Sequence, residues 1–88
     1  MPGVSRVGVD TAGGTIIEAL APSVFINSAY VAVLGCAVQG HGLPPHDSPV
    51  MAESSSTVFA ESIGVCRQGD KASCGHPATG SGDVFAGG

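Results

Sequence analysis

The chain has 88 residues, enough for one small domain, and its net charge of −4 with only three basic residues argues against nucleic-acid binding. Hydrophobic residues make up 43% of the sequence and charged residues 11%, which excludes a disordered chain. Fourteen glycines and six prolines exclude long helices, and no apolar run approaches the ~20 residues of a membrane span.

The N-terminal residues 1–6 lack the basic cluster and apolar segment of a signal peptide, so we expect synthesis in the cytoplasm. Further along the chain, residues 15–18, 24–27 and 30–34 are rich in β-branched side chains and are bordered by glycine or proline. These features are typical of short strands rather than helices. We therefore predict an all-β fold with few or no helices.

Internal similarity is the strongest organisational signal. Ser23-Val24-Phe25 recurs as Thr57-Val58-Phe59, 34 residues later, and a shortened third copy, Asp83-Val84-Phe85, lies near the end. Repeats that cannot bury a hydrophobic face alone pack on one another around a common core. We predict a small cone-shaped domain with a pseudo-threefold axis, in which the phenylalanine of each unit lies in the middle. The alternative is a generic β-rich chain with accidental tripeptide matches.

All three histidines lie in two loop-like segments, residues 40–47 and 73–77, which occupy the same place in the repeat. Equivalent loops of a pseudo-threefold stack emerge at one end, so four side chains are predicted to converge at an apex: His41, His46, Cys74 and His76. Three imidazoles and one thiolate form the ligand set of a closed structural Zn²⁺ site, and they disfavour hard cations. The spacing leaves iron as an alternative metal, and a solvated loop side chain is the alternative for each histidine alone.

The remaining cysteines, Cys36 and Cys66, follow apolar segments and are predicted to fill the core; a disulfide between them is the alternative. Catalytic motifs are lacking, because the acidic residues are scattered and the Thr11-Ala12-Gly13-Gly14 segment has no P-loop lysine. We therefore expect no enzymatic activity. The rival functions are a zinc-stapled adaptor that binds another protein and a small metallo-hydrolase, which would need an open coordination position.

Two segments carry a family resemblance. Residues 5–14 resemble the opening of the PAAR-repeat family, where a Gly-Asp turn precedes a His-Gly-Gly loop, and residues 60–75, ending in Gly69-Asp70-Lys71-Ala72-Ser73-Cys74-Gly75, resemble its most recognisable segment. The sequence departs from the family pattern where Ala12 replaces a histidine and where Cys36 replaces an aspartate.

The resemblance implies a single PAAR-like domain over residues 1–88 with no effector extension. Its zinc-bound apex would pierce a membrane, and its base would cap a trimeric β-helical spike of the phage-tail or VgrG-like kind, one chain per trimer. The resemblance further implies assembly into a virion tail tip or a type VI secretion apparatus, transient contact with the target cell membrane, and delivery through the target envelope.

Overall fold

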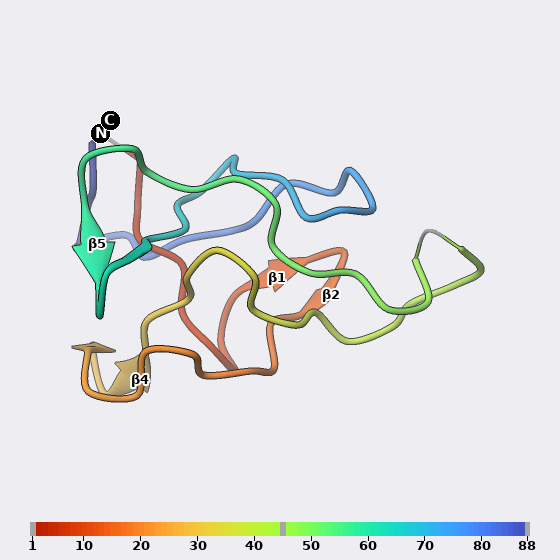
Figure 1. Ribbon diagram of the computed structural model, residues 1–88, viewed down its shortest axis with the longest axis horizontal. Helices are drawn as coiled ribbons and strands as arrows, with labels where there is room; N and C mark the ends of the chain where they lie inside the picture. The colour runs from red at the N-terminus through yellow and green to blue at the C-terminus, as the bar shows by residue number, and fades with distance from the viewer. Residues whose placement is uncertain (1, 45, 88) are drawn as a thin grey trace.

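Across the residues that the structure describes, the strands form three two-stranded antiparallel sheets. Strand β1 (Thr11–Ala12) pairs with β2 (Gly14–Thr15), β3 (Phe25–Ile26) with β4 (Ala29–Tyr30), and β5 (Phe59–Ala60) with β6 (Ile63–Gly64) (Figure 1). The computed structural model describes residues 2–44 and 46–87, and these contain no helix. The predicted all-β fold is confirmed. Over the same residues, nothing helical has the length and apolarity needed to cross a membrane.

The strands are shorter than predicted. Of residues 15–18, only Thr15 belongs to a strand, and of residues 30–34, only Tyr30 does. The next residues pair singly with different neighbours: Ile16 with Val38, and Val33 with Val65. No long ladder forms, because the chain winds around an axis and each segment passes from one partner to another.

The repeat is confirmed by two hairpins that match at the shift of 34 residues. Phe25 pairs with Tyr30, as Phe59 pairs with Gly64. Both residues of each connecting turn have positive φ, with 52° and 71° at Asn27 and Ser28, and 49° and 68° at Glu61 and Ser62. Positive φ at both central residues is the signature of the type I′ turn that two-residue hairpins favour. Asn27, predicted to lie in a strand, is therefore a turn residue.

Both ends of the chain build the third unit. Gly3 pairs with Phe85, and the Val4 amide donates to the Val84 carbonyl at 2.8 Å. Equivalent bonds join Val31 to Val24 and Val65 to Val58, each at 3.0 Å. The shortened third copy is thus completed by the N-terminal segment, which the sequence analysis did not anticipate.

A ring of three backbone hydrogen bonds marks the pseudo-threefold axis. The Ser5 amide donates to the Cys66 carbonyl at 3.0 Å, the Cys66 amide to Ala32 at 2.9 Å, and the Ala32 amide to Ser5 at 3.0 Å. All three residues are fully buried. One residue from each unit meets at the centre, so the predicted pseudo-threefold arrangement is confirmed.

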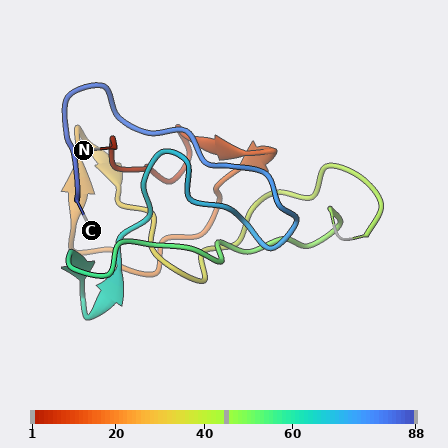
Figure 2. The same ribbon diagram turned by 90° about the horizontal axis from the view of Figure 1, so that it is seen from above.

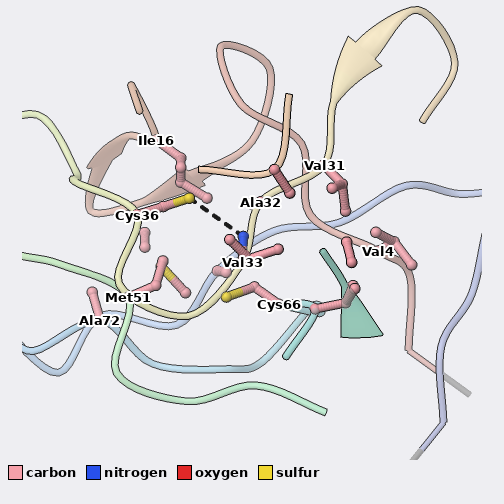
Figure 3. Close-up of a cluster of buried hydrophobic side chains, with 14 of the residues drawn as sticks. Val4, Ile16, Val31, Ala32, Val33, Cys36, Met51, Cys66 and Ala72 are labelled. Carbon is pink, nitrogen blue, oxygen red and sulfur yellow. Dashed lines mark hydrogen bonds between the residues drawn. The ribbon is translucent and has the colours of Figure 1, made fainter. Parts of the chain in front are cut away.

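Small side chains pack around this ring to form the core (Figure 3). Ile16 and Met51 are the largest fully buried side chains, and most of the rest are alanine or valine. Cys36 and Cys66 are fully buried free thiols, as predicted for core residues. Burial raises the pKa of the Cys66 thiol to about 12, so this sulfur stays protonated and behaves as a small hydrophobe.

The prediction that the repeated phenylalanines fill the middle is wrong. Phe25, Phe59 and Phe85 are 55%, 58% and 49% exposed. Neighbouring residues of an extended segment point to opposite faces, and Val24 and Val84 are the ones that pack against the core. The phenylalanine that follows each therefore points outwards.

Candidate metal centre

Each unit sends out a loop from an equivalent turn, and these turns set the direction of the loops. In each turn, a side chain accepts a hydrogen bond from a backbone N–H a few residues earlier. The Asp10 carboxylate accepts from the Arg6 amide and the Asp70 carboxylate from the Arg67 amide, both at 2.8 Å. Cys36 Sγ accepts from the Val33 amide at 3.3 Å. The last of these bonds is drawn in Figure 3. Cys36 thus takes the place of the aspartate, as the comparison with the PAAR-repeat pattern implied.

Backbone hydrogen bonds then tie neighbouring loops together. The Gln39 amide donates to the Thr15 carbonyl at 2.8 Å, and the Ser73 amide donates to the Val50 carbonyl at 2.7 Å. Seen from above, residues 40–44 and 46–48 project beyond the other loops at the end away from hairpins β3–β4 and β5–β6 (Figure 2). The loops therefore emerge at one end, as predicted.

The four predicted ligand residues meet at this end. His41 Nε2 lies 3.1 Å from His46 Nδ1 and 2.9 Å from His76 Nδ1, and Cys74 Sγ lies 3.7 Å from both His41 Nε2 and His76 Nδ1. The four donor atoms all lie within 4.8 Å of one another. Zinc bond lengths of about 2.05 Å to nitrogen and 2.3 Å to sulfur give tetrahedral edges of about 3.3 and 3.6 Å. The donor set therefore fits one tetrahedral ion.

Hydrogen bonding alone does not account for this cluster. His41 Nδ1 lies 3.1 Å from the Gln39 carbonyl oxygen, which can only accept, so Nδ1 carries the proton of the neutral ring. His41 Nε2 is then left with one lone pair, facing the ring nitrogens of both His46 and His76. A single lone pair cannot accept from both, whereas a cation between the rings would satisfy every donor atom at once. The Gln39 carbonyl also orients the ring, as partners of metal-bound histidines do.

Gly13 covers the remaining side of the cluster. Its φ is +88°, and a Cβ at this position would overlap His76 Nδ1 and lie 2.6 Å from His41 Nε2. Glycine is thus required here both for its backbone conformation and for the close approach. The sequence analysis missed this role, although the paired glycines after Ala12 were a usable signal.

The third unit, which the N-terminal segment completes, supplies no side-chain donor. Ala12 is fully buried, and only its carbonyl oxygen approaches the cluster, 3.9 Å from Cys74 Sγ. The first unit supplies His41 and His46, and the second supplies Cys74 and His76. The donor absent at Ala12 is therefore made up by a second histidine from the longest loop.

One polar network fixes the base of the first loop. Burial alone would raise the pKa of the Asp10 carboxyl, but hydrogen bonds from Arg6 and Thr79 outweigh it and hold the pKa below its usual value. Arg6 Nε donates to Asp10 at 2.7 Å, and Thr79 Oγ1 donates to it at 2.8 Å. Because Thr79 follows the loop of the second unit, this carboxylate joins the second unit to the N-terminal segment of the third.

Comparison with known families agrees with these repeats and loops. The PAAR motif family model matches residues 9–79, well over half of the chain, and the match includes all four residues of the cluster. Comparison with curated proteins finds no match. The chain therefore belongs to the PAAR motif family.

Proposed function

We propose that this protein is the metal-stapled tip of a contractile injection machine, either a phage tail or a type VI secretion apparatus. Its base would cap a trimeric β-helical spike, one chain per trimer, and its apex would lead through the target membrane. The observation that carries the proposal is the division of one pseudo-threefold body into two unlike ends. One end shows an exposed phenylalanine from each unit, and the other gathers the histidine and cysteine donors.

The broad end supports docking on a threefold partner. Phe25, Phe59 and Phe85 occupy equivalent positions, and each is about half exposed in the isolated chain. Exposed aromatic residues of this kind are enriched at protein interfaces. A monomer with three similar units can offer the same contact to each subunit of a trimer, which a chain without repeats cannot do.

Hydrogen bonds between units hold the broad end in shape. Glu61, in one turn, accepts from the Ser23 amide at 2.9 Å and from its hydroxyl at 2.6 Å. Asn27, in the equivalent turn, donates to Asp83 at 2.7 Å. These side chains connect each turn to a neighbouring unit, and they would keep the three aromatic rings in a fixed arrangement before docking.

Zinc is the metal we propose for the narrow end. Three imidazoles and a thiolate suit its borderline character, and four protein donors leave a tetrahedral ion no position for water. That closed set favours a structural role over hydrolysis, in keeping with a family of structural tip proteins. Small loops cannot hold a rigid point by packing alone, and a structural zinc site contributes on the order of 10 kcal/mol to folding.

Native mass spectrometry with the trimeric β-helix of a contractile spike tests the proposal. We expect one chain per trimer with one zinc ion, and loss of the complex in a triple variant carrying Phe25→Ser, Phe59→Ser and Phe85→Ser. Because these side chains are exposed, the variant should keep its fold and its zinc. A zinc-bound monomer that ignores cognate trimers would refute the spike proposal and favour a free adaptor. A monomer that binds no metal would refute the zinc site.

A further inference from the structure

The pseudo-threefold axis gives the molecule three equivalent flanks, and one of them differs from the others. On each flank, the segment that follows the loop of one unit donates a backbone N–H to the segment that precedes the loop of the next unit. The donor and acceptor residues are Ile17 and Ala37, Ala52 and Lys71, and Thr79 and Thr11. Both side chains of the first pair are aliphatic, whereas the second pair contains a lysine and the third consists of two threonines. Ile17 is also 55% exposed. The flank between the third and first units is therefore apolar at this pair, where the other two flanks are not.

This apolar flank carries a pocket of about 360 Å³. Aliphatic side chains line most of it, and one acidic residue joins them: Ile17, Ala37, Val38, Pro49, Val50 and Asp47. Val50, like Ile17, is substantially exposed. The pocket volume is near the lower end of the ~300–1,000 Å³ range of ligand sites, which suits one or two side chains of a bound peptide.

The charge around the pocket is negative. Asp47 lies in its wall, and Glu18 accepts the backbone N–H of the lining residue Ala37 at 3.2 Å. Both acidic residues are exposed. Across residues 2–44 and 46–87, the ion pairs of the two arginines are with Asp10 and Asp70, so neither arginine neutralises this flank.

We propose that this flank is a docking groove for an extended segment of another protein, one that places an aliphatic side chain in the pocket and a lysine or arginine beside Asp47 and Glu18. A threefold spike meets the three units alike and gives no reason for one flank to differ. An apolar pocket at the flank that differs from the other two suits a partner bound in one copy per chain. The proposal does not depend on docking at the base.

Selection from a displayed library of random dodecapeptides, on the full zinc-loaded chain, tests the groove. Ile17→Ser is the test variant, and Phe59→Ser, which replaces a similarly exposed side chain at the opposite end, is the matched control. We expect enriched peptides to combine aliphatic residues with lysine or arginine. A synthetic peptide of the enriched sequence should bind Ile17→Ser at least about fivefold more weakly and Phe59→Ser unchanged.

Two further measurements fix the position and the charge preference. Amide shifts in an NMR titration should move at Ile17, Ala37 and Val50, and exchanging the basic residues of the peptide for glutamate should weaken binding about threefold or more at low salt. Three outcomes would overturn the proposal. They are a selection that enriches no peptide on the native chain beyond those found on Ile17→Ser, amide shifts confined to the end that carries the phenylalanines, and equal affinity for the glutamate peptide and the basic peptide. Self-association of the chain through this flank, seen by light scattering, would overturn the proposal as well, because the occupant of the groove would then be a second copy of the chain.

Discussion

Replacing Gly13 by alanine should remove the metal and, with it, most of the stability that the metal supplies. A Cβ at Gly13 would overlap His76 Nδ1 and lie 2.6 Å from His41 Nε2, and both atoms belong to the donor cluster. The backbone cannot easily withdraw, because β1 and β2 pair directly on either side of this residue. The alanine methyl group would therefore push at least one imidazole out of position.

The size of the effect can be separated into two parts with a matched glycine. Gly69 has φ +93°, close to the +88° of Gly13, but a Cβ there meets nothing within 4 Å. Gly69→Ala should thus lower the free energy of unfolding only by the cost of placing alanine in the left-handed conformation, about 1–2 kcal/mol. For a domain of this size, that corresponds to roughly 5–15 °C in melting temperature. Gly13→Ala should lower the free energy of unfolding by the same amount and, in addition, by most of the contribution of the metal, which is on the order of 10 kcal/mol.

The assay is zinc content by elemental analysis together with thermal unfolding, with and without a chelator. We expect Gly69→Ala to retain one zinc ion and Gly13→Ala to retain almost none. The difference in stability between the two variants should disappear when the metal is removed from both. A Gly13→Ala protein with one tightly bound zinc ion and the stability of Gly69→Ala would show that the glycine does not wall the site, and would refute this reasoning.

Three other predictions concern the donor cluster, the buried thiols and acid stability. Cys74→Ser should lower zinc content and melting temperature sharply while the backbone resonances of hairpins β3–β4 and β5–β6 stay in place; unchanged zinc content would remove Cys74 from the site. A thiol reagent at pH 8 should label no cysteine in the zinc-loaded protein, only Cys74 after chelation, and all three after denaturation, because burial raises the pKa of Cys66 to about 12; labelling of Cys66 in the folded protein would contradict this. The lowered pKa of Asp10 means that its carboxylate stabilises the fold above the ordinary value of 3.8 and that this contribution is lost as the pH falls through the lower folded value. The stability difference between the native chain and Asp10→Asn, measured by urea unfolding, should therefore shrink as the pH drops towards and below 3.8, and a difference independent of pH would count against it.

Pattern in the sequence was enough to predict the repeat and the convergence of the donors. The shift between Phe25 and Phe59 predicted two matching hairpins, and the structure gives both the same pairing and the same turn conformation. Hairpin geometry is local, so equal sequences at equal spacing form equal turns. Once the units are equivalent, their loops must leave at the same end, which is why the sequence alone predicts that His41 and Cys74 lie close together.

Other features depended on contacts between residues far apart in the chain. Period-two alternation shows that Val24 and Phe25 face opposite ways, but not which of them faces the core. The smaller side chain was the one that fitted, because the centre is filled by a tight ring of backbone bonds through Ser5, Ala32 and Cys66. The large rings were left at the surface, contrary to the prediction.

What the sequence determined by itself is the all-β class, the family, the repeat and the convergence of three histidines and one cysteine, all of which follow from local spacing and residue type. Only the tertiary structure decided that the N-terminal segment completes the third unit, that Gly13 walls the histidine–cysteine cluster, and that the flank of Ile17 and Ala37 carries an apolar pocket. These features arise where segments from different units meet around the axis. Such meetings join residues as distant as Gly3 and Phe85, and they depend on the closure of the whole ring rather than on any one segment.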